Sequence, residues 1–233
     1  MEIESTLTKS EISVVILGAT GAVGGETLET LLQCKNVSKI SLLGRRPVED
    51  IKKSNVVQHE IDIFDPSTYN GLLEGHNVAI CTLGVGEPSK ISKEDFLKID
   101  KVAVLDFAIA CKKAGVKHFE LLSSVGINAK SSQYYLRAKG ELVEELKALN
   151  FERLSIFKPS MILTPTNRYG ISQGIILFIW PIINPFLFSV LKKYRGIKVE
   201  KLGSAIAKNI YTNGTGLEYL EWADFQRLDA INS

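Results

Sequence analysis

Residues 14–25, VVILGATGAVGG, constrain the fold of this 233-residue chain more than any other segment. The apolar run that opens the segment is typical of a strand buried on both faces. Glycines follow at Gly18, Gly21 and Gly24, and the next residues have helical spacing. In dinucleotide-binding folds, such a turn lets the backbone approach a pyrophosphate at the N-terminus of a helix. A tight turn without a ligand would need the same glycines. Evidence from the rest of the chain is therefore needed to distinguish a nucleotide site from a simple turn.

Expected strands and helices alternate along residues 12–163. Short apolar runs predict strands at residues 12–18, 39–44, 56–64, 76–84, 117–126 and 152–163. Amphipathic segments predict helices at residues 24–34, 93–116 and 134–150, and further on a helix at 199–211 and a last strand and helix within 216–228. This alternation indicates βαβ units, and therefore an α/β fold with a doubly wound parallel sheet, the Rossmann fold.

Charge and cysteine content exclude several classes of protein. The formal net charge is +2 and no dense run of Lys or Arg occurs, so no nucleic-acid partner is expected. The three cysteines, Cys34, Cys81 and Cys111, form no CxxC pair, which favours a reducing compartment. Residues 1–11 lack the features of a secretory signal, so we expect them to be a flexible leader of a cytoplasmic protein.

The end of the second expected strand indicates which dinucleotide would bind. NAD-binding folds usually carry an acidic residue there, which accepts hydrogen bonds from the ribose hydroxyls. Here the strand ends in LLGRRP, and the guanidinium groups of Arg45 and Arg46 suit a phosphate dianion. We therefore predict NADP(H), held through its 2′-phosphate, although a solvated basic turn would have the same sequence.

Tyr135 and Lys139 lie four residues apart in YYLRAK, on one face of the helix expected at residues 134–150. A neighbouring ammonium stabilises a phenolate, and so lowers the pKa of a phenol from its ordinary value of about 10. Such a pair can give a proton to a carbonyl oxygen, or take one from an alcohol, while a hydride moves. Two unrelated surface residues would show the same spacing, but this pair follows the fifth strand of the expected sheet.

Six segments occur in an order that resembles one known family: ILGATGAVGG, LLGRRP, CTLG, ACKKAGVKHFELLSSVGINAKSS, YYLRAKGELVEEL and FKPSMIL. Together they are similar to the atypical short-chain dehydrogenases/reductases of the Tat-interacting-protein oxidoreductase type, over roughly residues 12–170. The resemblance implies an NADPH-linked oxidoreductase and leaves its substrate open.

The resemblance also implies catalytic roles. Tyr135 would be the proton donor or acceptor, and Lys139 would support it and bind the ribose. Ser124, rather than Ser123, would polarise the carbonyl group. Asp100 stands near an asparagine of some family members, so any proton relay is expected to differ in this chain.

The resemblance implies cofactor contacts beyond the glycine turn. Asp62 would accept from the adenine amino group, Ile63 would lie against the ring, and Arg168 would close over a phosphate. The residues predicted to bind NADP(H) are Gly18, Thr20, Gly21, Ala22, Val23, Gly24, Arg45, Arg46, Asp62, Ile63, Leu83, Gly84, Tyr135, Lys139, Pro159, Ile162 and Arg168. No metal ligands are predicted.

Residues 171–191, ISQGIILFIWPIINPFLFSVL, do not follow the α/β pattern. The stretch approaches the length of a bilayer span, but Pro181 and Pro185 would kink or break a helix. It lies within residues 165–197, which we expect to form a small C-terminal apolar cap or insertion in a single NAD(P)-binding domain at 12–233. A substrate lid, a homodimer face, and a peripheral contact with an intracellular membrane or a protein all stay open.

Two classes of function are consistent with these features. An enzyme would transfer a hydride between NADP(H) and a small carbonyl or alcohol substrate, and the apolar cap suggests an apolar one. Alternatively, the chain would bind NADPH as a regulatory or redox-sensing protein, or act as a membrane-associated scaffold, with little turnover.

Overall fold

One seven-stranded sheet forms the centre of the structure, a computed structural model that describes residues 11–165 and 189–231. The strand order is β3-β2-β1-β4-β5-β6-β9, and every neighbouring pair is parallel. The strands are β1 (Ile12–Leu17), β2 (Val37–Gly44), β3 (Val56–Glu60), β4 (Val78–Cys81), β5 (His118–Leu122), β6 (Arg153–Phe157) and β9 (Gly216–Leu220). The predicted α/β parallel fold is confirmed. Because the order reverses between β1 and β4, their carboxyl ends open a crevice of the kind that binds ligands.

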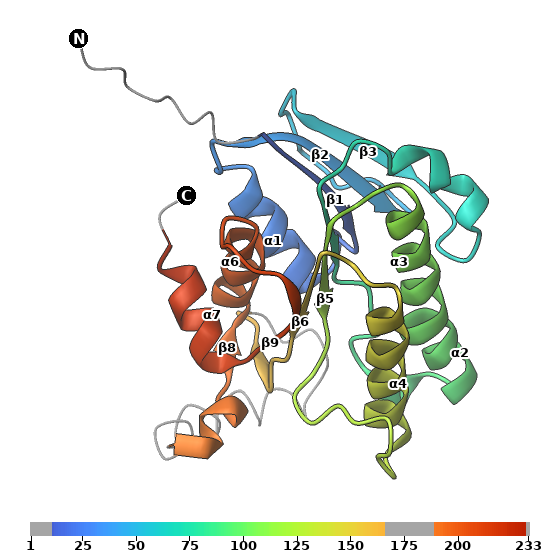
Figure 1. The fold of residues 1–233 in the computed structure, drawn as a ribbon, viewed down its shortest axis with the longest axis vertical. Helices are drawn as coiled ribbons and strands as arrows, with labels where there is room; N and C mark the ends of the chain where they lie inside the picture. The colour runs from blue at the N-terminus through green and yellow to red at the C-terminus, as the bar shows by residue number, and fades with distance from the viewer. Residues whose placement is uncertain (1–10, 166–188, 232–233) are drawn as a thin grey trace.

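Helices cover both faces of the sheet (Figure 1). One face carries α1 (Ala22–Leu31), α6 (Val199–Asn209) and α7 (Trp222–Asp229), and the other carries α3 (Val104–Lys113) and α4 (Tyr134–Ala148). Each layer encloses its own apolar cluster, and β1 contributes Val14 and Ile16 to one cluster and Val15 and Leu17 to the other. The continuous apolar run of β1 is therefore a consequence of burial on both faces.

The single helix expected at residues 93–116 contains a π-helical turn. It consists of α2 (Lys93–Leu97), the π-helical segment η4 (Lys98–Ala103) and α3. Gly115 follows α3 with a φ of +84°, as expected for a C-terminal cap. A π-helical turn has no periodicity signal of its own in a short sequence, so apolar spacing predicts the helix and misses the irregularity.

Four expected strands are shorter than predicted. β3 ends at Glu60 rather than at residue 64, and β6 ends at Phe157 rather than at residue 163. β4 and β5 end at Cys81 and Leu122, rather than at residues 84 and 126. Pro159 has no N–H group and cannot continue the β6 ladder as a donor. Beyond it, β7 (Ile162–Leu163) pairs in parallel with β8 (Ile197–Lys198) as a separate two-stranded sheet.

Much of the predicted leader and cap lies outside the described residues. This holds for residues 1–10 of the leader and for residues 166–188 of the apolar segment. The structure describes the end of that segment as part of the 3-10 helix η6 (Ser189–Tyr194), where Leu191 is exposed. Among the described helices, none combines the length and the apolar character that a bilayer crossing requires.

A cluster of polar side chains is buried at the amino edge of the sheet, between β5, β6, β9 and α6. Arg153 donates from Nε to Glu218 Oε1 at 2.8 Å and from Nη2 to Asn209 Oδ1 at 3.0 Å. Asn209 donates from Nδ2 to Glu120 Oε1 at 2.9 Å. His118 Nε2 lies 3.4 Å from the same Glu120 oxygen, and Glu120 itself is fully buried.

Burial shifts both titratable groups of this cluster toward their neutral forms. It raises the pKa of Glu120 to about 8, a shift that the hydrogen bond from Asn209 and the charge of Arg153 oppose. It lowers the pKa of His118 to about 3, and the charge of Arg153 acts in the same direction. The Glu120–His118 contact is therefore a neutral pair and does not act as an ion pair near neutral pH.

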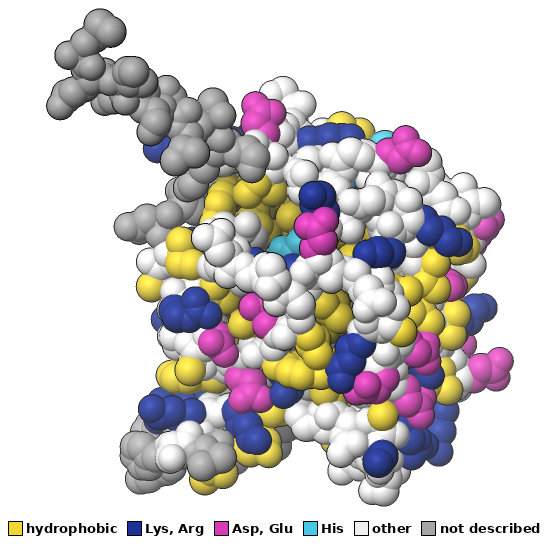
Figure 2. Space-filling model, in the orientation of Figure 1, with side chains coloured by type: hydrophobic (Ala, Val, Ile, Leu, Met, Phe, Trp, Pro, Cys, Tyr) yellow, Lys and Arg dark blue, Asp and Glu magenta, His cyan; other side chains and the backbone are white. Residues whose placement is uncertain are grey.

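Acidic and basic side chains are interspersed on the face of the molecule drawn in Figure 2. Several charged side chains of the protein form ion pairs, such as Lys101 with Glu141 at 2.8 Å and with Glu145 at 3.1 Å. This pairing links η4 to α4 at the surface and contributes little to stability, since solvent screens exposed charges.

Candidate functional site

The glycine turn after β1 is a narrow cradle that leads into α1. Gly18 has a φ of +100°, and a Cβ atom there would lie 2.7 Å from the Leu83 nitrogen. A Cβ atom on Gly24 would lie 2.6 Å from Thr82 Oγ1. The Gly21 N–H donates to the Gly18 carbonyl at 3.0 Å, directly before the first residue of α1. The turn and the start of α1 therefore lie close to the residues that follow β4, and side chains at Gly18 and Gly24 would not fit between them.

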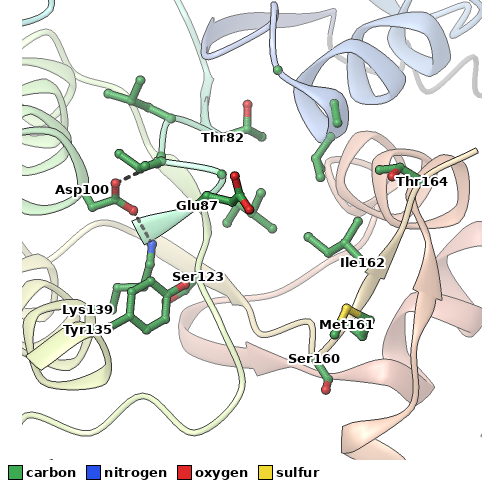
Figure 3. A pocket seen from close by; sticks show the side chains of 18 residues that line it. Thr82, Glu87, Asp100, Ser123, Tyr135, Lys139, Ser160, Met161, Ile162 and Thr164 are labelled. Atoms are coloured by element: carbon green, nitrogen blue, oxygen red, sulfur yellow. Dashed lines mark hydrogen bonds and ion pairs between the residues drawn. The ribbon is translucent and has the colours of Figure 1, made fainter. Parts of the chain in front are cut away.

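A cavity of about 420 Å³ opens beside this cradle, at the carboxyl ends of β1, β4 and β5 (Figure 3). It brings together residues from the turn after β1, the loop after β4, helix α4 and β7. The predicted site residues that line it are Gly21, Ala22, Val23, Leu83, Gly84, Tyr135, Lys139 and Ile162. The sequence reasoning did not assign Val85, Gly86, Glu87, Ser160, Met161 and Thr164, which also line it. The GVG run at residues 84–86, in the loop after β4, is the one signal in the sequence that could have indicated part of this group.

Lys139 and Asp100 form a buried ion pair in this cavity. Lys139 Nζ lies 3.0 Å from Asp100 Oδ1, and Asp100 is 2% exposed. Asp100 Oδ2 accepts a hydrogen bond from the Val85 N–H at 2.8 Å. Burial opposes the charge on Lys139, but Asp100 and Tyr135 outweigh it, so the pKa of Lys139 is raised and the side chain stays cationic.

Tyr135 lies beside this ion pair, as its spacing from Lys139 predicts. Lys139 Nζ is 5.6 Å from the centre of the Tyr135 ring, and both side chains project from α4 into the cavity (Figure 3). The Tyr135 ring packs against Phe96 of α2 with 5.3 Å between ring centres, which fixes its position. Tyr134 packs against another side of Phe96 and does not line the cavity.

The two serines after β5 lie in different environments. Ser123 lines the cavity, is 8% exposed, and its Oγ is buried with no hydrogen-bond partner in the part of the chain that the structure describes. Ser124 is half-buried, does not line the cavity, and donates to the Val125 carbonyl at 3.3 Å. The structure thus places Ser123, and not the predicted Ser124, in the wall of the cavity.

Arg46 lines a second, smaller cavity of about 190 Å³ on the far side of the glycine turn. Thr20 and Gly44 line it as well, so it joins the turn after β1 to the end of β2. Arg45 is exposed next to it and does not contribute to its wall. Of the two predicted phosphate ligands, Arg46 therefore has the position that faces the cradle.

Three predicted cofactor contacts lie away from both cavities, and a fourth is not described. Asp62 is exposed and its Oδ1 accepts from the Phe64 N–H at 2.9 Å, while the Ile63 side chain is buried in the core. Pro159 is buried, and its carbonyl accepts from the Val125 N–H at 2.9 Å. None of these three lines either cavity, and Arg168 lies outside the described residues.

Cysteine and metal chemistry find no support in the described residues. The three cysteines are free and buried, and burial raises the pKa of the Cys81 thiol to about 12. The same part of the chain contains no group of three or more His, Cys, Asp or Glu side chains that could hold a metal ion. The titratable side chains that line the first cavity are those of Glu87, Asp100, Tyr135 and Lys139.

Comparisons with known proteins bear on the family and the fold. Residues 18–170 match a protein family described as NAD(P)H-binding. Protein HTATIP2 of Rattus norvegicus is 39% identical over 153 residues, which cover 65% of this chain and 63% of that protein. The chain thus spans less than two thirds of the length of that relative. Protein FMP52-1, mitochondrial, of Scheffersomyces stipitis is 31% identical over 196 residues, which cover 84% of this chain and 82% of that protein.

A solved structure supports the fold. A short-chain dehydrogenase from Burkholderia cenocepacia J2315, crystallised in complex with NADP, superposes with a TM-score of 0.64 at 15% identity. The superposition covers 93% of this chain and 91% of that chain. At this identity the similarity concerns the arrangement of the sheet and its helices.

Proposed function

Because this chain belongs to the NAD(P)H-binding, atypical short-chain dehydrogenase/reductase family, we propose that it is an NADPH-dependent oxidoreductase in which Tyr135 donates the proton. One observation supports the proposal most strongly: Tyr135, Lys139 and Ser123, whose hydroxyl has no hydrogen-bond partner among the described residues, line the cavity that opens beside the glycine cradle.

The residues of the site fit a dinucleotide in two respects. Side chains at Gly18 and Gly24 would close the space between turn and β4, so the glycines keep that backbone accessible. The buried Ser123 hydroxyl has no protein partner among the described residues, so a ligand can supply one without displacing an existing hydrogen bond. Bound NADPH would supply the hydride.

The chain's own residues would then perform the proton transfer. The Tyr135 hydroxyl gives its proton to the carbonyl oxygen as negative charge develops there, and Lys139 stabilises the phenolate that remains. Ser123 donates a hydrogen bond to the same carbonyl oxygen. Phe96 holds the Tyr135 ring, so the hydroxyl needs little reorganisation before it reacts.

Arg46 would select NADPH over NADH through the 2′-phosphate. A charge-assisted hydrogen bond contributes about 1.5–3 kcal/mol, so Arg46→Ala should weaken NADPH binding by about 10–100-fold and leave NADH binding nearly unchanged. Arg45→Ala is the matched control, because Arg45 does not line the cavity and a smaller loss is expected. Fluorescence titration with both nucleotides measures this, and equal wild-type affinities for NADPH and NADH would refute the assignment.

Tyr135→Phe should abolish carbonyl reduction and leave NADPH affinity within a few-fold of wild type, since it removes the proton donor and keeps the ring. Tyr134→Phe, one residue away and outside the cavity, is the control and should keep its activity. NADPH oxidation is followed with a panel of aldehydes, ketones and quinones, including apolar ones. If the wild-type protein binds NADPH and reduces none of them, the regulatory or redox-sensing alternative replaces the enzyme.

The compartment is a separate proposal. Composition favours the cytoplasm, whereas several relatives carry the word mitochondrial in their names. Cell fractionation with matrix and cytosol markers distinguishes the two.

A further inference from the structure

We propose that Asp100 is a positioning residue of this site, which holds Lys139 and the loop after β4 in one fixed arrangement. The inference rests on the proposed function in one respect only: the positioned ammonium group serves Tyr135 during hydride transfer. Its structural part concerns Asp100, Lys139 and Val85 and does not depend on turnover.

The π-helical segment η4 places Asp100 in the site. Asp100 is buried, although it lies on a segment whose neighbours Lys98 and Val102 are exposed. An extra residue in one helical turn changes the direction of the side chains that follow it, and π-helical turns are frequent at functional sites. Lys101, the next residue, pairs with Glu141 and Glu145 at the surface. The adjacent residues Asp100 and Lys101 of η4 therefore contact different side chains of α4.

The two carboxylate oxygens of Asp100 contact different segments of the chain. Oδ1 lies 3.0 Å from Lys139 Nζ of α4, and Oδ2 accepts from the Val85 N–H at 2.8 Å (Figure 3). A Cβ atom on Gly84 would lie 3.1 Å from Asp100 Oδ1, so the carboxylate packs directly on the backbone of this loop. One side chain thus links the wall of the cavity after β4 to the lysine on α4.

The pairing determines which donors of Lys139 remain for other partners. An ammonium group has three N–H donors. Asp100 takes one of them, which leaves two that can reach the Tyr135 hydroxyl and the ribose of a bound nucleotide. Without Asp100, the buried ammonium would have no carboxylate partner among the described residues and no fixed orientation.

The other titratable groups around the pair do not replace Asp100. Tyr135 of α4 lies on the same side of Lys139, and Cys81 of β4 is a neutral thiol because burial raises its pKa to about 12. Glu87, which lines the same cavity from the loop after β4, forms an ion pair with Lys90. The pKa of Lys139 therefore depends mainly on its burial, on Asp100 and on Tyr135.

Asp100→Asn tests the proposal, because the amide has nearly the same shape but offers one acceptor oxygen where the carboxylate offers two. Its single oxygen cannot occupy both the position of Oδ1 beside Lys139 Nζ and that of Oδ2 beside the Val85 N–H, and the amide carries no charge. Loss of an opposite charge at this distance lowers a lysine pKa by about 1–3 units, so the alkaline limb of the pH–rate profile should move to lower pH by a similar amount. Misplacement of the ammonium should reduce kcat by up to about 100-fold.

A readout without turnover accompanies the kinetics. NMR of ¹³Cε-labelled lysine follows the titration of Lys139, and loss of its signal in Lys139→Met assigns it. In Asp100→Asn the pKa of Lys139 should fall below its wild-type value. Glu141→Gln is the matched control, since it removes a surface ion pair between the same two segments, η4 and α4, and should change neither the Lys139 titration nor the pH–rate profile.

The outcomes separate the two proposals. If the wild-type protein reduces no carbonyl but Asp100→Asn still lowers the pKa of Lys139, the proposed function fails and the positioning role stands. If a folded Asp100→Asn variant keeps the wild-type pH–rate profile and Lys139 titration, the positioning role is refuted and the proposed function stands. A variant that only unfolds at a lower temperature, with both readouts unchanged, also refutes it.

Discussion

Replacement of Glu120 by glutamine should change how the stability of this protein depends on pH. Burial raises the pKa of Glu120 to about 8, compared with 4.5 for an ordinary glutamate. Between these values the folded state binds a proton that the unfolded state has lost. Each pH unit in this window therefore lowers the free energy of unfolding by about 1.4 kcal/mol, which amounts to roughly 3 kcal/mol from pH 5.5 to pH 8.

His118 changes the free energy of unfolding with pH in the opposite direction. Its pKa is lowered to about 3, compared with 6.5 for an ordinary histidine, so between these values the unfolded state binds the extra proton. The free energy of unfolding then rises with pH through this window. In the wild-type protein the two slopes offset each other up to about pH 6.5, and only the fall caused by Glu120 remains above it. Glu120→Gln should leave only the rise caused by His118.

The difference between variant and wild type isolates Glu120, because all other groups titrate in both proteins. Urea unfolding followed by circular dichroism at several pH values from 5.5 to 8 should show the variant gaining about 3 kcal/mol relative to wild type over this range. Glutamine keeps the acceptor for Asn209 Nδ2. Glu152→Gln, at an exposed position, is the control and should show a difference that does not vary with pH. A pH-independent difference for Glu120→Gln would mean that Glu120 is ionised in the folded protein.

Two further predictions follow from packing. Gly24→Ala should destabilise the protein by about 1–3 kcal/mol and abolish NADPH binding, because its Cβ would lie 2.6 Å from Thr82 Oγ1. Gly25→Ala is the control and should bind NADPH normally, since the nearest atom given for its Cβ is 3.7 Å away. Thermal unfolding and nucleotide titration compare the two variants. The three buried cysteines should resist a thiol reagent such as Ellman's in the folded protein and all react in denaturant, and rapid labelling of the native protein would contradict their burial.

Apolar spacing was sufficient to predict the layers of the fold. The alternation of short apolar runs with amphipathic segments requires a parallel sheet covered on both faces, and the structure has that sheet. The ends of elements were less predictable. The ends of β3 and β6 and the π-helical turn in η4 depend on hydrogen bonds to segments distant in sequence, which local periodicity does not record.

The glycine turn and the Tyr135–Lys139 pair could be found because each is a local pattern with a physical requirement. A turn packed against β4 needs glycine, and two side chains on one helix face need a spacing of four. Ser123 and Ser124 are adjacent and chemically identical, so only the path of the chain after β5 determines which of the two lines the cavity.

The sequence by itself therefore determined the sheet, the cradle and the helix that carries Tyr135 and Lys139, because these follow from side-chain periodicity and from the steric needs of glycine. Only the tertiary structure decided that Ser123 lines the cavity, that Arg46 rather than Arg45 borders the cradle, and that Asp100 holds Lys139. These placements depend on how β4, β5, η4 and α4 lie relative to one another, although they are distant in sequence. A contact between residues 39 positions apart, such as Asp100 and Lys139, has no signature in either local sequence.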